Sequence, residues 1–305
     1  DGYNTNVLST NTVITNNTFN NPDYAGIYLQ YHNVPIISGN TILNTASIGI
    51  EVNNGYNGMQ ITKNRITGAG SYGIYLYSCI GGTGFPDGPG LVANNFIQCG
   101  SAYGIDVYSS SNQNIYYNSV NVTATNGYGY YGYSNTTNVV VQNNIFANSA
   151  GGYAVYYGNA NGATVMDYNN LYTTGNFVGL YGSTSVIDIE AWRTTSGKDE
   201  HSISYYPGFV SSTDLHTASP WINGKAVVFS EVTDDIDGNA RDGSTPDIGA
   251  DEYDPAPGTT TPLSGTYTIG TGGNYTTFKA AVADLLLKGV SGPVTFNVLS
   301  GTYNE

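Results

Sequence analysis

Hydrophobic and polar residues alternate in short stretches along residues 1–180. An apolar side chain occupies every second position in stretches such as Ile27-Tyr28-Leu29-Gln30 and Ile50-Glu51-Val52-Asn53. Alternation with a period of two is typical of β-strands that are buried on one face. The pattern therefore predicts a series of short strands with one row of side chains in a core and the other pointing outward.

The same region repeats itself about every 24 residues. A tripeptide Asn-x-apolar begins at Asn17, Asn40, Asn64, Asn94, Asn118, Asn143 and Asn169, and a second column, Gly or Ala before an apolar residue, begins at Gly26, Gly49, Gly73, Gly104, Gly129, Ala154 and Gly179. Both columns lengthen at one repeat, where residues 80–90 form an insertion. Two columns with a shared period indicate a solenoid of stacked units.

A repeat of this length has room for three short strands but not for a crossover helix. We therefore predict an all-β fold, a right-handed parallel β-helix of about seven or more rungs spaced about 4.8 Å apart. The Asn column is expected to adopt left-handed turn geometry and to hydrogen-bond from rung to rung. The Gly column is expected to mark a second tight corner.

The rest of the chain divides by composition. Residues 181–254 are expected to continue the β-helix and close it with an acidic C-terminal cap, including a short helix near residues 187–192, and residues 255–264 form a Pro/Thr linker. Phe278, Val282, Leu285 and Leu286 have the spacing of one helix face between about Thr277 and Lys288. With a strand at residues 293–298, residues 265–305 are expected to be the capping helix and first strand of a following β-helix unit.

Several segments resemble the C-terminal end of right-handed, pectate-lyase-like β-helix domains in large secreted surface proteins of Bacteroidota. The segments are Asp199–Ile203, Pro207–Val210, Asp214–His216, Ser219–Asn223, Asp235–Arg241 and Pro246–Glu252. Residues 265–305 resemble the beginning of another such domain. The resemblance implies a closing cap and an exported, surface-displayed protein, but it does not imply one particular activity.

Charge narrows the range of partners. Only 10% of residues are charged, and 22 acidic residues against 8 basic ones give a net charge of −14 and a pI near 4.2. A chain this acidic is not suited to binding nucleic acid or anionic membrane surfaces. No apolar stretch is long enough to span a bilayer.

The outward positions predict a tyrosine-rich face. Its members are Tyr28, Tyr75, Tyr77, Tyr108, Tyr131, Tyr133 and Tyr156. Tyrosine rings are suited to sugar stacking or to a protein contact. Alternatively, tyrosine is present for its β propensity and stacks on its own copies along the sheet.

Two carboxylates lie in the same outward column. Glu51 and Asp106 are two rungs apart, about 9–10 Å at the expected rung spacing, and inverting glycosidases hold their carboxylates roughly 6.5–9.5 Å apart. However, Tyr75 would lie between them and no further acids surround them, so solubilising surface charge is the simpler interpretation. They are the only catalytic candidates.

Other residue types add little to the case for an enzyme. Lys63 and Arg65 are the only basic residues before residue 180, and we expect them to be solvated or to discourage edge-to-edge aggregation. His32, His201 and His216 belong to no catalytic motif. We therefore expect no catalytic activity.

Metal and disulfide candidates remain open. Asp235, Asp237 and Asn239, with Gly238, resemble the start of a calcium loop, but Pro246 stands where an EF-hand has its twelfth-position Glu. The alternative is a turn in which Arg241 pairs with a neighbouring acid, so no cofactor is required and calcium is a candidate only. Cys79 and Cys99 either form a disulfide across the insertion or remain as two free thiols.

These features favour a structural or adhesive module of an extracellular bacterial fibre or giant surface protein. Its partners would be copies of itself or neighbouring β-helix domains, joined head to tail. The assembly residues would be Phe278, Val282, Leu285, Leu286, Val294 and Phe296. Alternatives are a β-helix that binds surface glycans through its tyrosine face, or a polysaccharide-degrading enzyme that uses Glu51 and Asp106.

Overall fold

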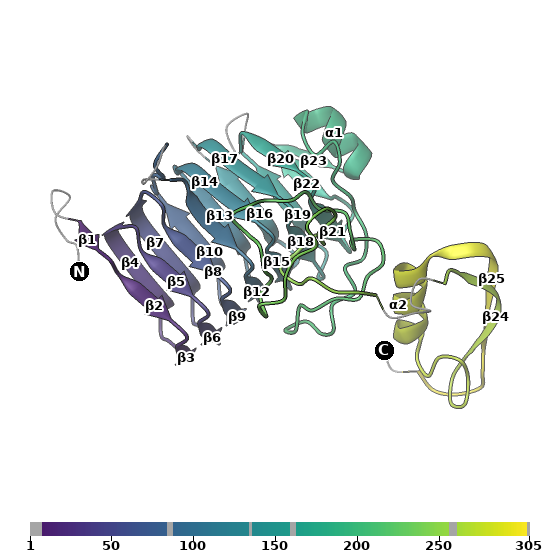
Figure 1. Ribbon diagram of the computed structural model, residues 1–305. Coiled ribbons are helices and arrows are strands. Elements are labelled where there is room, and N and C mark those ends of the chain that lie inside the picture. Colours follow the sequence, from purple (N-terminus) through teal and green to yellow (C-terminus); the bar gives the residue numbers. More distant parts are fainter. Residues whose placement is uncertain (1–7, 84–87, 134–135, 159–162, 256–260, 304–305) are drawn as a thin grey trace.

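The chain folds into a coil of short strands that stack into three sheets (Figure 1). The computed structural model describes residues 8–83, 88–133, 136–158, 163–255 and 261–303. Each turn of the coil contributes one strand to each sheet, and the neighbours of a strand come from the turns before and after it. Two of the sheets have seven strands each, so the predicted parallel β-helix of at least seven rungs is confirmed.

The strands are distributed over the sheets in regular order. The first sheet contains β1 (Ser9–Thr10), β4 (Ala25–Asn33), β7 (Ile48–Tyr56), β10 (Tyr72–Tyr77), β13 (Tyr103–Tyr108), β16 (Tyr128–Tyr133), β19 (Tyr153–Tyr157), β22 (Gly179–Tyr181) and β23 (Thr184–Val186). The second contains β2 (Val13–Thr15), β5 (Ile36–Ser38), β8 (Gln60–Thr62), β11 (Gly90–Ala93), β14 (Ser111–Tyr116), β17 (Thr137–Gln142) and β20 (Val165–Asp167). The third contains β3 (Thr18–Asn20), β6 (Thr41–Leu43), β9 (Arg65–Ala69), β12 (Phe96–Cys99), β15 (Ser119–Val122), β18 (Ile145–Asn148) and β21 (Asn170–Thr173). Neighbouring strands are parallel except β22 and β23.

Inward side chains from the three sheets form one continuous core. In the first sheet Ile27, Ile50, Ile74 and Ile105 are in register from rung to rung, and each is almost completely buried. Burying an aliphatic side chain of this size contributes roughly 1.5–3 kcal/mol. Because each rung buries its apolar residues against the rungs on either side, stability depends on stacking rather than on any single rung.

The far end of the coil is closed by a short helix. Helix α1 (Ile189–Ser196) begins at Asp188, whose side chain accepts a hydrogen bond from the backbone of Ala191, and it ends at Gly197. Trp192 is fully buried, and its ring fills the space beside Gly179 in the last parallel strand. The indole covers apolar residues that would otherwise face solvent at the end of the core.

The acidic segment lies along the side of the coil and does not cap its end. Residues 203–254, here called the strap, contain turns and isolated bridges but no strand. They run back over the outer faces of the second and third sheets, as the green loops in front of the strands show (Figure 1). Ile222 and Ile248 of the strap are buried against the outward side chains of Tyr117 and Ile145. The prediction that residues 203–254 cap the end of the coil is therefore wrong, whereas the short helix predicted near residues 187–192 is present as α1 and does close it.

A ladder of asparagines, all buried except Asn17 in the first rung, forms the corner between the second and third sheets. Its members are Asn17, Asn40, Asn64, Asn95, Asn118, Asn144 and Asn169. At each step the backbone N–H and the Nδ2 of one asparagine donate to the Oδ1 of the next, as for Asn118 and Asn144 at 2.9 Å. The ladder satisfies polar groups in a corner that the strand hydrogen bonds do not reach, so the predicted rung-to-rung bonding is confirmed.

In two rungs the ladder is one residue away from the predicted position. It passes through Asn95 and Asn144, whereas Asn94 and Asn143 precede it and have φ values of +56° and +63°. The left-handed geometry therefore belongs to the residue before the ladder and not to the ladder asparagine itself. A slip of one residue reverses which side chains point inward.

The strap explains why the register of these two rungs differs from the predicted one. In the pair Ile145-Phe146, Phe146 points into the coil core, while Ile145 points outward and is buried beneath the strap. Phe96-Ile97 repeats the arrangement, with Ile97 inside and Phe96 covered. Because both faces are apolar at these positions, the Asn-x-apolar pattern fits either register.

The glycines of the second repeat column are required for a different reason from the predicted tight corner. Gly49 and Gly104 lie within strands of the first sheet and do not have positive φ. A Cβ at Gly104 would lie 2.2 Å from the side chain of Val120 in the third sheet, and one at Gly49 would lie 2.6 Å from that of Ile66. The column is required by close packing between two sheets, not by a tight corner.

Residues 263–303 form a small terminal unit beyond the coil (Figure 1, yellow). Strands β24 (Leu263–Ile269) and β25 (Val290–Val298) pair in parallel, and helix α2 (Phe278–Lys288) lies between them in sequence. The helix begins at Thr277, whose hydroxyl accepts a hydrogen bond from the backbone of Ala280, and it ends at Gly289. These bounds confirm the predicted helix and strand. Neither helix in the described chain has the length and apolar character needed to cross a bilayer.

Candidate functional site

The structure places the predicted outward columns in register on the first sheet. One column contains Tyr28, Glu51, Tyr75, Asp106, Tyr131 and Tyr156, and the next contains Gln30, Asn53, Tyr77, Tyr108 and Tyr133. We call the tyrosines of this sheet the tyrosine face. It has a third column that the sequence reasoning missed, made of Tyr72, Tyr103, Tyr128 and Tyr153. The missed signal is a tyrosine immediately before Gly73, Gly104, Gly129 and Ala154, four of the seven members of the second repeat column.

Rings of the tyrosine face stack on one another along the coil. Tyr131 and Tyr156 have their centroids 4.2 Å apart with planes at 10°, and Tyr77 and Tyr108 are 5.4 Å apart at 3°. Because the broad faces of such rings cover each other, their edges and hydroxyls point to solvent. A sugar would have to displace these ring–ring contacts to stack. The geometry therefore favours self-stacking over glycan binding as the role of these rings.

Glu51 and Asp106 are buried among these rings and are not solubilising surface charges. Their exposed fractions are only 6% and 5%. Glu51 accepts a hydrogen bond from the Tyr24 hydroxyl at 2.9 Å, whereas Asp106 Oδ1 has no hydrogen-bond partner among the described residues. Tyr75 is paired with both in the strand register, so it lies between them as predicted.

Burial dominates the electrostatics of both carboxyl groups. It raises the pKa of Asp106 to about 8, because the charged form is not hydrated and no donor replaces the lost water. Burial also raises the pKa of Glu51, although the Tyr24 hydroxyl partly opposes the shift. Asp106 is therefore mostly neutral at neutral pH. A covered acid and a covered base give a glycoside substrate little access, so the pair has poor geometry for hydrolysis.

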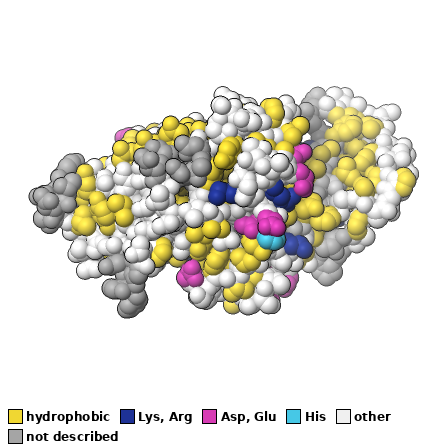
Figure 2. All heavy atoms as spheres, turned by 90° about the horizontal axis from the view of Figure 1, so that it is seen from above, with side chains coloured by type: hydrophobic (Ala, Val, Ile, Leu, Met, Phe, Trp, Pro, Cys, Tyr) yellow, Lys and Arg dark blue, Asp and Glu magenta, His cyan; other side chains and the backbone are white. Residues whose placement is uncertain are grey.

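The two basic residues of the coil hold the strap in place. Lys63 Nζ is 2.6 Å from Asp234, and Arg65 is 2.5 Å from Asp237. Their expected role as solvated or anti-aggregation charges is wrong, because both make ion pairs with residues more than 170 positions away. On the face drawn in Figure 2, acidic, basic and histidine side chains lie side by side near the centre of an otherwise weakly charged surface.

The predicted calcium ligands do not converge on a common point. The Asp235 carboxylate accepts hydrogen bonds from the backbones of Asp237 and Asn239, and the Asn239 amide donates to it at 3.1 Å. The Asp237 carboxylate points instead to Arg65 and His216. An anion surrounded by N–H donors has no need of a cation, and the arrangement is that of a turn.

Arg241 closes the strap as the alternative interpretation proposed. Its guanidinium bonds to Glu252 at 3.1 Å and to the Asn94 side chain at 2.7 Å. It also stacks 3.9 Å from the centre of the Tyr117 ring. Because Asn94 and Tyr117 belong to the coil, this one side chain ties the acidic segment to two rungs.

His216 is the residue nearest to a metal-binding arrangement in the described chain. Its ring and the carboxylates of Asp237 and Asp251 offer three ligand atoms within 4.8 Å of one another. The His216 ring nitrogens, however, are hydrogen-bonded to Asp214 and Asp237, and Asp251 accepts from the backbone of Thr217. A metal would have to displace these bonds. Sequence patterns assign His216 no role, because its partners are 2 to 35 residues distant and form no local motif.

Cys79 and Cys99 are free thiols, so the disulfide alternative is wrong. Both are completely buried in the coil core. The Cys79 thiol lies against the carbonyl of Val52, and the Cys99 thiol lies against that of Ala69. Burial raises the pKa of the Cys79 thiol to about 12, so both behave as small core residues.

The assembly residues divide into two groups in the terminal unit. Val294 and Phe296 are partly buried, and the Phe296 ring contacts those of Tyr267 and Tyr275. Phe278, Val282 and Leu286, by contrast, form an exposed stripe on α2. Leu285, the fourth residue of the predicted helix face, is partly buried.

Comparison with known proteins identifies the fold of the first rungs. Residues 2–85 match the family model described as right-handed β-helix region. No curated protein and no solved structure matches the chain. Together with the parallel sheets, the match establishes a right-handed parallel β-helix.

Proposed function

We propose that this chain is a structural or adhesive module of an extracellular fibre or giant surface protein. In this proposal β-helix units join head to tail, and the terminal unit covers the open end of the next coil. The joined units are either separate copies of the chain in a polymer or consecutive domains of one long polypeptide. The contact between the terminal unit and the next coil is the same in the two cases. No cofactor and no catalytic step are part of the proposal.

The observation that carries the proposal is the uncovered apolar surface of the terminal unit. The exposed apolar residues there are Phe278, Val282, Leu286, Val290, Val298 and Leu299. Strand β25 pairs with β24 on one edge only among the described residues. An unpaired edge beside exposed apolar side chains is suited to strand addition by a further rung.

The first rung of the coil offers a matching surface. Strands β1, β2 and β3 each pair on one side only within the described chain. Ile14 and Phe19 of this rung are partly buried, whereas Ile37 and Ile42 of the next rung are fully buried. A contact between the two different ends is heterologous, and a heterologous contact that does not close into a ring produces a filament.

The burial of Glu51 and Asp106 supports the non-enzymatic part of the proposal. Both carboxyl groups are covered by tyrosine rings that stack on each other rather than lining a cleft. The self-stacked rings likewise give a flat, regular flank, which suits a scaffold better than a catalytic groove.

A point substitution at the exposed edge tests the proposal. Val298→Asp places a charge at a half-exposed position of β25, where it should not disturb the chain itself. We expect sedimentation velocity to show association of the unmodified chain that grows with concentration, and a monomer for the variant. Val228→Asp is the matched control, because Val228 on the strap is exposed to the same extent. An unmodified chain that remains monomeric at every concentration would contradict the proposal.

The two versions of the proposal differ in the mass of the native polypeptide. Material taken from its source and fully denatured should have a mass several times 32.3 kDa if units are consecutive domains of one chain. A denatured mass near that of the present chain would indicate separate subunits. Mass spectrometry of the denatured polypeptide distinguishes them.

A further inference from the structure

Three segments of the strap that are distant in sequence meet at one imidazole ring. His216 lies beside Asp237, which is 21 residues further along, and beside Asp251, which belongs to a third segment. One ligand atom from each of the three side chains, a ring nitrogen and two carboxylate oxygens, lies within 4.8 Å of the other two. Zn²⁺ bonds its nitrogen and oxygen ligands at about 2.0–2.2 Å, so small shifts of these side chains would bring all three atoms onto one cation.

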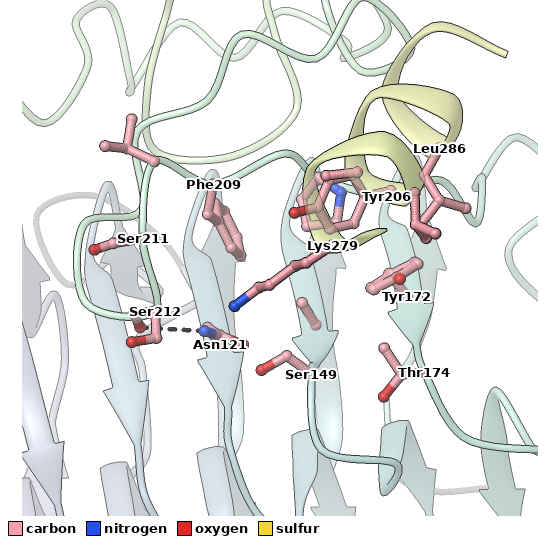
Figure 3. A pocket seen from close by; sticks show the side chains of 15 residues that line it. Asn121, Ser149, Tyr172, Thr174, Tyr206, Phe209, Ser211, Ser212, Lys279 and Leu286 are labelled. Atoms are coloured by element: carbon pink, nitrogen blue, oxygen red, sulfur yellow. Dashed lines mark hydrogen bonds between the residues drawn. The ribbon is translucent and has the colours of Figure 1, made fainter. Parts of the chain in front are cut away.

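The coil fixes the position of this ring. The His216 ring packs edge-on against Phe96 of β12, with the ring centroids 4.8 Å apart and the planes at 90°. The strap turn that precedes it is tied to the third sheet, because Asn121 of β15 donates a hydrogen bond to the carbonyl of Ser212 at 3.1 Å (Figure 3). A ligand that is held in place beforehand loses less conformational entropy on binding.

The hydrogen bonds of the His216 ring direct one of its nitrogens toward the two aspartates. Nδ1 is 2.5 Å from the carboxylate of Asp214, and Nε2 is 2.7 Å from that of Asp237. A histidine that ligates a metal usually donates its other ring N–H to a carboxylate, which fixes the tautomer and the orientation of the ring. Asp214 is placed to orient the ring in this way and leaves Nε2 as the ligating atom.

Asp251 contributes a buried carboxylate with little to compensate its charge. It is 6% exposed, and within the described chain it accepts one hydrogen bond, from the backbone of Thr217 to Oδ2 at 3.1 Å. Burying an anion is costly unless it is well paired, and buried charges are generally paired or coordinate metals. This observation is independent of the ring geometry, and it points to a cation as the further partner of Asp251.

The charges around the ring match one divalent cation. The three aspartates carry three negative charges when ionised, and Arg65 offsets one of them through its ion pair with Asp237 at 2.5 Å. With a neutral His216 ring, three minus one leaves two negative charges. A proton on the ring neutralises only one of these, whereas a divalent cation neutralises both.

We propose that His216 Nε2 and the carboxylates of Asp237 and Asp251 bind a divalent transition-metal ion of the Zn²⁺ class, which locks the strap. The cation replaces the proton that Nε2 shares with Asp237, and that proton passes to solvent. The hydrogen bond displaced in this way, 2.7 Å between Nε2 and Oδ2, opens to about 3.4 Å, the separation of two ligand atoms on a tetrahedral Zn²⁺. An imidazole nitrogen among the ligands favours Zn²⁺ over Ca²⁺ and Mg²⁺, which take oxygen ligands.

The ion would connect three strap segments that no strand holds together in the described chain. Through the ion pair of Asp237 with Arg65, the connection extends to β9 of the coil. The site uses neither end of the coil nor the terminal unit, so it stands or falls independently of the proposed head-to-tail association.

The test is a calorimetric titration of the full chain at neutral pH, after removal of metals with a chelator. The probes are Zn²⁺, Ca²⁺ and Mg²⁺, each added separately. We expect one Zn²⁺ to bind per chain, at least about a hundredfold more tightly than either of the other two cations. No binding of Zn²⁺, or binding of Ca²⁺ as tight as that of Zn²⁺, would overturn the proposal.

Variants assign the ligands. His216→Ala should abolish Zn²⁺ binding, and Asp237→Asn, at a partly exposed position, should weaken it at least about tenfold. Asp214→Asn removes the orienting carboxylate but no ligand, and it should weaken binding about 10–100-fold. His201→Ala is the matched control, because the His201 ring contacts one carboxylate, that of Asp167 at 2.7 Å, and it should leave binding unchanged. Zn²⁺ binding that is unchanged in His216→Ala or in Asp237→Asn would refute the site.

Limited proteolysis measures the lock. At a free Zn²⁺ concentration of about a hundred times the dissociation constant, cleavage of the strap should slow about a hundredfold, because the strap must release the ion before it opens. The same Zn²⁺ should not protect the strap of Asp251→Asn, which keeps the shape of the buried side chain but not its charge. Equal cleavage of the unmodified chain with and without saturating Zn²⁺ would overturn the role of the ion as a lock.

Discussion

The buried carboxyl of Asp106 makes stability depend on pH in a way that one substitution should remove. Its side chain is 5% exposed and lies in a column between Tyr75 and Tyr131, with Oδ1 lacking a hydrogen-bond donor. Burial raises its pKa from the ordinary value of 3.8 to about 8. Asn has nearly the same shape and does not ionise, so Asp106→Asn isolates the cost of the charge.

The sign follows from proton linkage. The folded state binds the Asp106 proton more tightly than the unfolded state, so unfolding releases a proton between the two pKa values. Stability therefore falls as pH rises from about 4 to about 8 and is constant for this group above that range. A difference of about four pKa units corresponds to a loss on the order of 5 kcal/mol, because each unit is worth about 1.4 kcal/mol.

Urea unfolding at pH 5 and pH 9, followed by circular dichroism, measures the effect. We expect the charge of Asp106 to cost the unmodified chain only about 1–2 kcal/mol relative to the variant at pH 5 and several kcal/mol at pH 9. Glu51→Gln is the comparison, and it should show the same sign with a weaker dependence, because the Tyr24 hydroxyl already stabilises the Glu51 carboxylate. A difference between Asp106→Asn and the unmodified chain that is identical at both pH values would refute the reasoning.

Three other predictions follow from buried or bridging groups. Asn118→Ala removes a ladder amide and strands the donors of Asn95, so it should cost at least about 3 kcal/mol in urea unfolding, whereas Asn20→Ala at an exposed position should cost little. Cys79 and Cys99 should fail to react with a thiol reagent until the chain is unfolded, because both thiols are buried and have raised pKa values; rapid labelling of the folded chain would contradict this. Burial lowers the pKa of His216, but hydrogen bonds to Asp237 and Asp214 raise it on balance, so the strap should be most stable below pH 6.5 and lose this contribution as pH rises through the folded pKa. Limited proteolysis of His216→Gln should therefore show faster strap cleavage than the unmodified chain at low pH and equal cleavage at high pH.

Periodicity alone was sufficient to predict the coil. The alternation of apolar and polar residues predicts which side chains of the first sheet point inward. The prediction succeeds there because the outward row of side chains is polar and the inward row is apolar. The same reasoning failed at Asn94 and Asn143, where the strap makes the outward row apolar as well. The sequence predicts the register of a strand only where one face of the strand is apolar and the other is polar.

The contacts of the candidate functional site could not be predicted from the sequence, because they join residues that are far apart along the chain. Lys63 and Asp234 are 171 residues apart, and nothing in the spacing of either residue indicates the other. The outward column predicts a surface charge at Asp106, yet Tyr72 and Tyr103 of the neighbouring column lie beside it and bury it together with its own column. The burial of an outward residue depends on the size of its neighbours in other rungs. Those neighbours are known only once the rungs are stacked in three dimensions.

The two long flanks of the coil are sealed in different ways, and this directs association to the ends. Along one flank the strap covers the outward apolar residues and is tied down by Lys63, Arg65 and Arg241. Along the other flank the tyrosine rings cover each other and the acids beneath them. At the end of the coil away from helix α1, strands β1, β2 and β3 each pair on one side only among the described residues, and so do β24 and β25 of the terminal unit. Because unpaired edges are where strands add, a coil sealed along its sides, with free strand edges on its first described rung and on the terminal unit, should grow in one dimension, as a linear array requires.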